Sequence, residues 1–299
     1  MFQGIYTAII TPFRDGKVDE KKVEELVAFQ VEAGVPGIVA CGTTGESLFL
    51  SKDEQKRILE ICATVCKGKA QLIAATGALS AEDTITNTHQ AQKAGADVAL
   101  IINPWYVKQS QESIYQHYKK ISENVDLPIL LYNNPTRTGM EISLETIVRL
   151  ASFKNIQGLK DATSCLKRVS ELKRQLGNQF QLFDGNDDTL AAFLAMGGNG
   201  GIMNATNVAP SLFVTLIKAW KENDLSTFKT TWQVAFPLVS ALALESNPAP
   251  IKYAMTLVHG VSIESRMPFA PLSPKTQEAI EAALSDLGLW KSLAVARER

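Results

Sequence analysis

The amino-acid sequence predicts an α/β fold, a (β/α)8 TIM barrel with a small C-terminal helical region. Short apolar and β-branched runs alternate with amphipathic helical stretches, which is the pattern of successive βαβ units. Eight such runs recur at intervals of roughly 25 to 30 residues, a spacing that favours a closed barrel of eight βα repeats over an open doubly wound sheet. After about residue 208 only helical periodicity continues.

The first half of the barrel begins with a strand that should stop at Thr11-Pro12. Residues 18–34 are predicted to form a helix, because apolar side chains recur on one face and a glycine stands at its end. Ser51 and Glu54 should open the next helix with a capping box, and a third helix is expected to begin near Ser80. The first four strands are predicted at 5–10, 37–41, 71–75 and 97–102.

The second half of the chain completes the barrel and then changes character. Its four strands are predicted at 128–132, 156–160, 180–183 and 201–203. Helical stretches follow at 210–222, 225–245, 248–259 and 273–287. We therefore divide the chain into a catalytic barrel, residues 1–223, and a C-terminal helical region, residues 224–299, which should pack on the barrel or on a neighbouring subunit.

The composition argues against several classes of partner. With 299 residues and 45% apolar content, the chain can bury one large core. Its formal net charge of -1 and its pI of about 6.3 provide no basic surface for a nucleic acid. No apolar run approaches the roughly 18 residues of a membrane span, and the first residues lack the cationic region of a signal peptide. We expect a soluble, cytoplasmic protein that binds neither nucleic acid nor membranes.

No metal site and no nucleotide site are predicted. The four cysteines include one close pair, Cys62 and Cys66, whose spacing is helical rather than that of a C-x-x-C metal motif, and we interpret all four as reduced core thiols. The three histidines are isolated from each other and from any acidic ligand pattern. The glycine cluster at 197–201 precedes its strand, whereas a glycine loop that binds nucleotide phosphates follows one.

Lys160 lies at the end of the sixth predicted strand, within the segment 156–163. A lysine held at the inner end of a buried strand loses hydration in its charged form, which favours the free amine that can attack a carbonyl carbon. A solvated lysine at a strand end is the commoner case, because lysine is rarely buried. The residues that follow the other strands therefore decide between the two interpretations.

Those residues favour a site at this end of the barrel, because the loops after TIM-barrel strands form the active face. The G-T-T-G-E segment at 42–46 offers backbone N–H groups and hydroxyls suited to a carboxylate, although an ordinary turn would use the same residues. Tyr132 would stand beside Lys160, one strand away, unless it is a core aromatic with a satisfied hydroxyl. Arg137, two residues after a proline, is either a surface charge or a carboxylate clamp.

Three motifs resemble the dihydrodipicolinate synthase family, which belongs to the pyruvate-dependent class I aldolases together with N-acetylneuraminate lyase. They are G-T-T-G-E at 42–46, Y-N-x-P-x-R-T at 132–138 and G-L-K-D-A-T at 158–163. The resemblance extends from Phe2 to about Leu289, nearly the whole chain. The first motif and the lysine identify the superfamily, and Arg137 points to the synthases, because the sialic acid lyases lack that arginine.

The resemblance implies that the chain condenses pyruvate with L-aspartate-4-semialdehyde, on the route to diaminopimelate and lysine. Lys160 would form the Schiff base with pyruvate. Tyr132 and Thr43 would relay protons together with Tyr106, which would reach in from the adjacent subunit. No metal or organic cofactor is implied, since the lysine activates the substrate, and the family is usually a homotetramer built as a dimer of dimers.

The family's substrate contacts map onto four further positions. Thr44 would hold the pyruvate carboxylate, and Arg137 would hold the carboxylate of aspartate semialdehyde. Gly185 and Ile202 would provide backbone contacts near the bound pyruvate. These assignments are implied by the resemblance, position by position.

Two alternatives stay open. Another pyruvate-dependent aldolase or dehydratase on the same barrel would act on a sugar acid or a different aldehyde, because the fold and the Schiff-base lysine do not set the second substrate. Arg137 argues against an acceptor with a neutral end. A non-catalytic relative would only bind a small keto acid as a sensor, and the presence of both Lys160 and Tyr132 argues against it.

The resemblance also bears on inhibition by free lysine. Where lysine-sensitive relatives commonly have histidine, asparagine and tyrosine, this chain has Lys52, Leu79 and Trp105. Lys52 would repel the ammonium group of the ligand, unless it simply reaches into solvent, and Leu79 offers no hydrogen bond. Although Asp83 keeps the acidic character that would favour binding, we expect weak inhibition or none.

Overall fold

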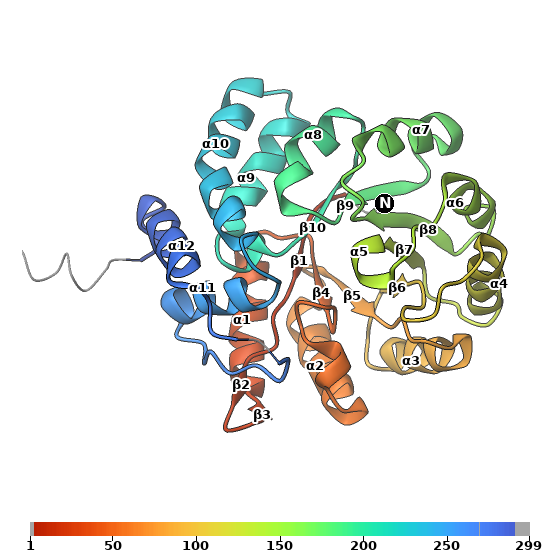
Figure 1. The fold of residues 1–299 in the computed structure, drawn as a ribbon, viewed down its shortest axis with the longest axis horizontal. Helices are drawn as coiled ribbons and strands as arrows, with labels where there is room; N and C mark the ends of the chain where they lie inside the picture. Colours follow the sequence, from red (N-terminus) through yellow and green to blue (C-terminus); the bar gives the residue numbers. More distant parts are fainter. Residues whose placement is uncertain (1–2, 269, 291–299) are drawn as a thin grey trace, which may run out of the picture.

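The computed structural model describes residues 3–268 and 270–290, and it confirms the predicted fold class. Eight strands form the barrel: β1 (Gly4–Ala8), β4 (Gly37–Ala40), β5 (Gln71–Ala75), β6 (Val98–Ile102), β7 (Ile129–Asn133), β8 (Ile156–Asp161), β9 (Gln181–Asp184) and β10 (Gly200–Met203). All pairings are parallel, each strand lies beside the next one along the chain, and β10 closes the barrel on β1 (Figure 1). This is the arrangement that successive right-handed βαβ units produce.

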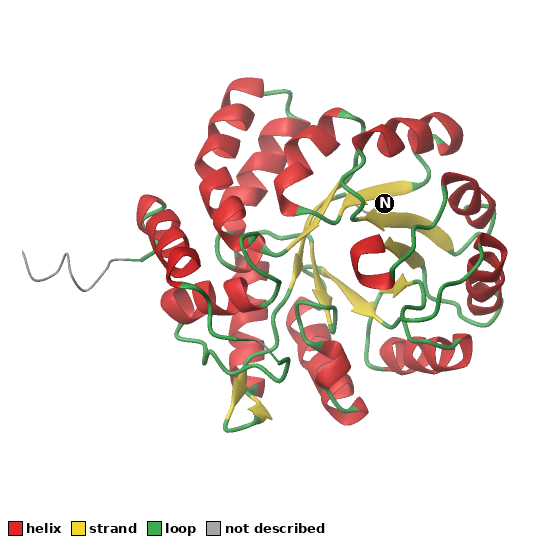
Figure 2. Cartoon of the chain, in the orientation of Figure 1, coloured by secondary structure: helices red, strands yellow, loops and turns green. Residues whose placement is uncertain are grey.

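Helices surround the strands, as the outer helices and inner strands of Figure 2 show. The outer helices of the barrel are α1 (Glu20–Glu32), α2 (Lys52–Cys66), α3 (Ala81–Lys93), α4 (Gln111–Ser122), α6 (Leu144–Leu150), α7 (Leu166–Leu176), α8 (Leu190–Ala195) and α9 (Pro210–Lys221). A short helix, α5 (Pro135–Thr138), lies in the loop after β7, and single 3-10 turns follow three other strands at Ser47–Phe49, Asp187–Thr189 and Ala205–Asn207. The predicted capping box of α2 is present, with Ser51 and Glu54 each bonding the other's backbone N–H, and Ser80 caps α3.

The predicted start of the first helix is wrong by two residues, because Val18 belongs to a small hairpin. The hairpin joins β2 (Phe13–Arg14) to β3 (Lys17–Val18), and α1 begins only after the N-cap Asp19. Asp15 and Gly16 form the turn with φ of 53° and 73°. An Asp-Gly pair with two positive φ angles is the preferred two-residue hairpin turn, so the local chemistry of the turn overrides the helical periodicity here.

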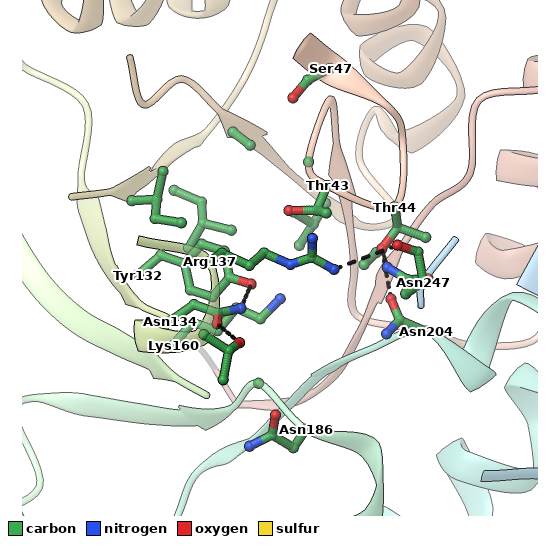
Figure 3. A pocket seen from close by; sticks show the side chains of 18 of the residues that line it. Thr43, Thr44, Ser47, Tyr132, Asn134, Arg137, Lys160, Asn186, Asn204 and Asn247 are labelled. Atoms are coloured by element: carbon green, nitrogen blue, oxygen red, sulfur yellow. Dashed lines mark hydrogen bonds between the residues drawn. The ribbon is translucent and has the colours of Figure 1, made fainter. Parts of the chain in front are cut away.

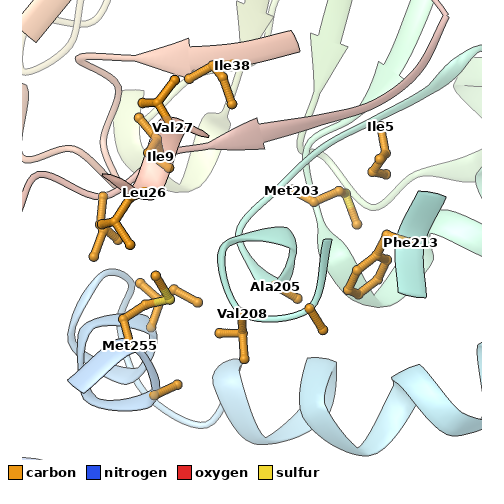
Figure 4. Close-up of a cluster of buried hydrophobic side chains, with 14 of the residues drawn as sticks. Ile5, Ile9, Leu26, Val27, Ile38, Met203, Ala205, Val208, Phe213 and Met255 are labelled. Carbon is orange, nitrogen blue, oxygen red and sulfur yellow. The ribbon is translucent and has the colours of Figure 1, made fainter. Parts of the chain in front are cut away.

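The C-terminal helices form as predicted and share one hydrophobic core with the barrel. They are α10 (Leu225–Leu242), α11 (Ala249–His259) and α12 (Pro274–Asp286). Met255 of α11 belongs to the same cluster of buried side chains as Leu26 of α1 and Ile5 of β1 (Figure 4). Burial of this apolar surface joins the helical region to the barrel. The division of the chain after residue 223 stays a prediction.

The barrel interior is filled by side chains. Tyr6 and Phe183 meet edge to face with their ring centroids 5.4 Å apart, and Ile202 packs in the same cluster with only 1% of its surface exposed. A filled interior confines any ligand site to the end of the barrel. In the part of the chain that the structure describes, no helix is long and apolar enough to cross a membrane.

Candidate active site

A cavity of about 610 Å³ opens at the end of the barrel where the strands finish, which is the end that the sequence predicts. Its walls come from the loops after each strand from β4 to β10, and from the α10–α11 connection. These loops bring together residues far apart in the chain. The polar residues of the wall include Thr43, Thr44, Tyr132, Asn134, Arg137, Lys160, Asn186, Asn204 and Asn247 (Figure 3).

Lys160 and Tyr132 are neighbours in this cavity, as predicted. They face each other in the register of β7 and β8, and the Lys160 Nζ lies 4.5 Å from the centroid of the Tyr132 ring. Lys160 is 8% exposed and Tyr132 is 9% exposed, although both reach the cavity. The pleat directs side chains at matched positions of adjacent strands to the same face, which explains why two residues 28 positions apart form one pair.

The Tyr132 hydroxyl is held by the loop that follows its own strand. Asn134 Nδ2 donates to the Tyr132 hydroxyl at 2.8 Å, and the Thr136 hydroxyl donates to Asn134 Oδ1 at 2.7 Å. Burial raises the pKa of Tyr132, but the positive charge of Lys160, the Asn134 hydrogen bond and the charge of Arg137 together outweigh burial, so that the pKa is lowered overall. A phenol with a lowered pKa is better suited to exchange protons near neutral pH.

The loop after β4 presents unpaired N–H groups. The Thr44 hydroxyl donates to Asn204 Oδ1 at 2.7 Å and accepts from Asn247 Nδ2 at 3.0 Å. Neither the backbone N–H of Thr43 nor that of Thr44 has a hydrogen-bond acceptor among the described residues. Because buried N–H groups are nearly always paired, two free ones at a cavity wall suit an anionic ligand.

Arg137 lies in α5 and extends along the cavity toward Thr44 and Asn247 (Figure 3). Its Nη2 donates to the backbone oxygen of Asn247 at a long 3.5 Å, and the residue is exposed. The guanidinium is therefore mostly free of protein acceptors. A guanidinium with one long hydrogen bond at a cavity wall can bind a carboxylate with two parallel hydrogen bonds.

Of three further predicted site residues, one lines the cavity and two lie outside its wall. Gly185 lines the cavity, where a Cβ would come within 2.7 Å of the Ala162 Cβ. Ile202 lies outside the wall, because its side chain packs in the barrel interior. Tyr106 also lies outside the wall and is 93% exposed, with φ of 74°. Its predicted entry into the site of another subunit stays a prediction.

Two aspartates at the end of β9 and in the loop after it have raised pKa values, and one of them lines the cavity. Asp187 lines the cavity and accepts hydrogen bonds from the backbone N–H groups of Asn204 at 3.0 Å and Ala205 at 2.6 Å. Burial raises the pKa of Asp187, while these N–H groups and the charge of Lys160 oppose the rise. Asp184 is 1% exposed, and burial raises its pKa to about 7.

Sequence reasoning missed the contribution of the C-terminal region to this wall. Val239, Leu242, Asn247, Ile251 and Met267 all line the cavity. The Asn-Pro pair at 247–248 signals a turn, but no local pattern relates that turn to a loop 200 residues earlier. The position of Asn247 beside Thr44 is a tertiary contact only.

All four cysteines are free, and three of them are buried. Cys165 is exposed at the start of α7, so its interpretation as a core thiol is wrong, because the loop after β8 carries it outward. Among residues 3–268 and 270–290 no group of three or more His, Cys, Asp or Glu side chains is placed to hold a metal ion.

Known proteins resemble this chain over nearly its full length. It matches the model of the dihydrodipicolinate synthetase family over residues 1–287. A 4-hydroxy-tetrahydrodipicolinate synthase of Rhodospirillum centenum is 41% identical over 97% of this chain and 99% of its own, and that of Parvibaculum lavamentivorans is 42% identical with the same coverage.

Solved structures agree with the sequence comparison. The chloride-inhibited dihydrodipicolinate synthase of Acinetobacter baumannii, complexed with pyruvate, superposes with a TM-score of 0.93 at 38% identity, over 97% of this chain and 100% of that one. The dihydrodipicolinate synthase of Aquifex aeolicus superposes with a TM-score of 0.94 at 35% identity and the same coverage.

Proposed function

The chain belongs to the dihydrodipicolinate synthetase family, and we propose that it is a 4-hydroxy-tetrahydrodipicolinate synthase, a lyase of diaminopimelate and lysine biosynthesis. Its substrates would be pyruvate and L-aspartate-4-semialdehyde. The observation that carries the proposal is the buried pair of Lys160 and Tyr132 at a cavity that is also lined by Thr43 and Thr44, whose N–H groups have no acceptor among the described residues. A relative that is complexed with pyruvate, at 38% identity, supports the choice of keto acid.

The proposed reaction begins on Lys160. Its neutral amine adds to the ketone carbon of pyruvate, and loss of water leaves an iminium whose positive nitrogen withdraws electrons. The methyl group then loses a proton, and the resulting enamine carbon attacks the aldehyde of the semialdehyde. Tyr132, together with Thr43 and Tyr106, would move the protons in these steps. No organic cofactor or metal is assigned a role, since the iminium supplies the electron sink.

The carboxylates of the two substrates are assigned to different walls. The pyruvate carboxylate would accept hydrogen bonds from the N–H groups of Thr43 and Thr44, because the Thr44 hydroxyl is already engaged by Asn204 and Asn247. Arg137 would hold the carboxylate of aspartate semialdehyde.

Two backbone contacts and the assembly complete the proposal. Gly185 and Ile202 would contribute backbone contacts near the bound pyruvate. The enzyme would work in the cytoplasm as a homotetramer, a dimer of dimers in which Tyr106 enters the adjacent site.

Trapping with borohydride tests the covalent step. Borohydride added with pyruvate should reduce the iminium and place the added mass on the peptide that carries Lys160. Lys160→Arg should remain folded and lose both the labelling and nearly all turnover, because a guanidinium stays protonated. Label on a different lysine, or no label at all, would refute the assignment.

A coupled assay tests the second substrate. Aspartate semialdehyde should be consumed with pyruvate, whereas N-acetylmannosamine should not, and the reverse result would favour a sialic acid lyase instead. Arg137→Ala should lower the use of the semialdehyde by roughly ten- to a hundredfold while pyruvate trapping persists, because charge-assisted hydrogen bonds contribute about 1.5–3 kcal/mol. Binding of pyruvate with no turnover of any aldehyde would favour the sensor alternative.

Weak inhibition by free lysine is part of the proposal. Lys52 Nζ donates to Asn87 Oδ1 at 2.8 Å, so its charge is held at the surface. Leu79 is 56% exposed and offers a ligand no hydrogen bond. A dihydrodipicolinate synthase of Cyanidioschyzon merolae, 30% identical, has been solved with lysine bound, and lysine titrated into the coupled assay would show whether this chain shares that property.

A further inference from the structure

Glu46 closes the loop after β4, and its surroundings are unusual for a carboxylate. It is 1% exposed, and its backbone has φ of 54°, in the left-handed region that glycine adopts without steric cost. A buried charge in a disfavoured backbone conformation persists only where neighbouring groups hold it in place. The groups that hold Glu46 therefore show which parts of the chain the loop after β4 depends on for its conformation.

The partners of the Glu46 carboxylate all come from the C-terminal region. Oε1 forms an ion pair with Lys252 of α11, whose side chain is 1% exposed. Oε2 accepts hydrogen bonds from the Ser265 hydroxyl at 2.8 Å, from Arg266 N–H at 2.8 Å and from Met267 N–H at 3.0 Å. One carboxylate thus ties a helix and a following segment to the loop after β4.

The segment that contains Ser265, Arg266 and Met267 makes further hydrogen bonds, both to Lys252 and to residues near Glu46. Lys252 Nζ donates to the backbone oxygen of Glu264 at 2.6 Å. The Arg266 guanidinium donates to both carboxylate oxygens of Glu54, at 2.7 and 2.6 Å, and to the backbone oxygen of Phe49 at 3.0 Å. The segment that contacts Glu46 is therefore held to the protein by several further hydrogen bonds.

The C-terminal region meets the same loop a second time at Thr44. Asn247 Nδ2 donates to the Thr44 hydroxyl at 3.0 Å, and the free N–H groups of Thr43 and Thr44 lie just before Glu46. We propose that Glu46 and Lys252 are positioning residues whose buried ion pair holds this loop so that the two N–H groups meet the carboxylate of the keto acid on Lys160. The inference rests on the proposed function, because it takes pyruvate as the Schiff-base substrate.

Pyruvate-dependent trapping on the full-length chain tests the inference without the second substrate. Glu46→Gln and Lys252→Met should each raise the pyruvate concentration for half-maximal borohydride labelling by about tenfold or more, because misplaced donors weaken ground-state binding. The extent of labelling at saturating pyruvate should change much less. Glu20→Gln, which removes an exposed ion pair with Arg57, is the matched control and should behave as wild type.

The double variant Glu46→Gln with Lys252→Met separates positioning from stability. Each single variant leaves one buried partner without its counter-charge, whereas the double variant leaves none, so its melting temperature should recover. Its pyruvate affinity should stay low, since the amide has lost the acceptor-to-ammonium contact that sets the loop. Recovery of both properties, or wild-type pyruvate dependence in all three variants, overturns the inference alone. If wild-type protein traps no pyruvate, the proposed function fails and this inference falls with it.

Discussion

Burial of the single residue Asp184 should make the stability of the folded protein depend on pH. Asp184 ends β9 almost fully buried, and accepts hydrogen bonds from the Asn186 N–H at 2.9 Å and the Thr189 hydroxyl at 2.7 Å. Burial raises its pKa from 3.8 to about 7, and the two hydrogen bonds only partly oppose the rise. The folded state therefore holds the proton of Asp184 more tightly than the unfolded chain does.

The sign of the resulting pH effect follows from linkage. A folded pKa above the unfolded value means that the contribution of Asp184 to stability is full below about pH 4, declines as the pH rises from about 4 to about 7, and is absent above that. Asp184→Asn should remove this decline, so that the variant gains stability relative to wild type by up to about 4 kcal/mol across that window. Urea unfolding at pH 4.5 and 7.5 measures the difference.

A control variant separates the effect of the buried carboxyl group from the effect of losing one negative charge. Asp126→Asn removes a charge from an exposed loop position and controls for the loss of net charge. Equal pH dependence in wild type and Asp184→Asn would mean that the buried carboxyl is ionised throughout the range.

Among the secondary-structure elements, α2, the helix that follows the Thr43–Thr44 loop, allows a direct test of helix capping. Its capping box pairs the Ser51 hydroxyl with the Glu54 N–H at 3.2 Å and the Glu54 carboxylate with the Ser51 N–H at 2.8 Å. Ser51→Ala should destabilise the protein by about 1 kcal/mol, which lowers the melting temperature by about 2–4 °C. Ser51→Asp should retain most of the stability, because aspartate is an equally good N-cap.

Calorimetry on the three proteins checks this order. A loss in Ser51→Asp as large as that in Ser51→Ala would show that the hydroxyl matters for another reason than capping.

Local turn chemistry also explains the hairpin that the helical pattern did not predict. At 13–18 the Asp-Gly turn prevails over periodicity, because two adjacent positive φ angles cannot be part of an α-helix.

In the whole molecule, the position of Tyr106 bears on how the subunits assemble. Tyr106 is 93% exposed and lies outside the cavity wall, although its neighbour Trp105 lines the cavity. If Tyr106 serves the adjacent site, as proposed, inactive subunits should complement each other. Mixed assemblies of Lys160→Arg and Tyr106→Phe chains would then recover about a quarter of the wild-type sites, because half of the random pairs are mixed and each has one complete site.

A second mixture controls for non-specific rescue. Lys160 and Tyr132 belong to the same chain and the same cavity, so mixing Lys160→Arg with Tyr132→Phe should restore nothing. No recovery in the first mixture, or equal recovery in both, would contradict the exchange of Tyr106 between subunits.

The fold, and the end of the barrel at which the cavity opens, could both be predicted from the sequence. Strand and helix periods differ, and the alternation of eight strands with helices leaves few topologies. Lys160, Tyr132 and Thr43 could be assigned to one end because parallel strands finish at the same edge, so that order along the chain translates directly into position.

The way in which the C-terminal helices complete that end could be seen only in the folded structure. Asn247 meets Thr44 across 203 positions, and Arg266 meets Glu46 across 220. Periodicity and turn chemistry act over a few residues, whereas the partner of a buried hydroxyl or carboxylate depends on which surfaces the hydrophobic core brings together. The donors that surround Glu46 could therefore not be predicted from the sequence, because the packing of the C-terminal helices against the barrel brings them there.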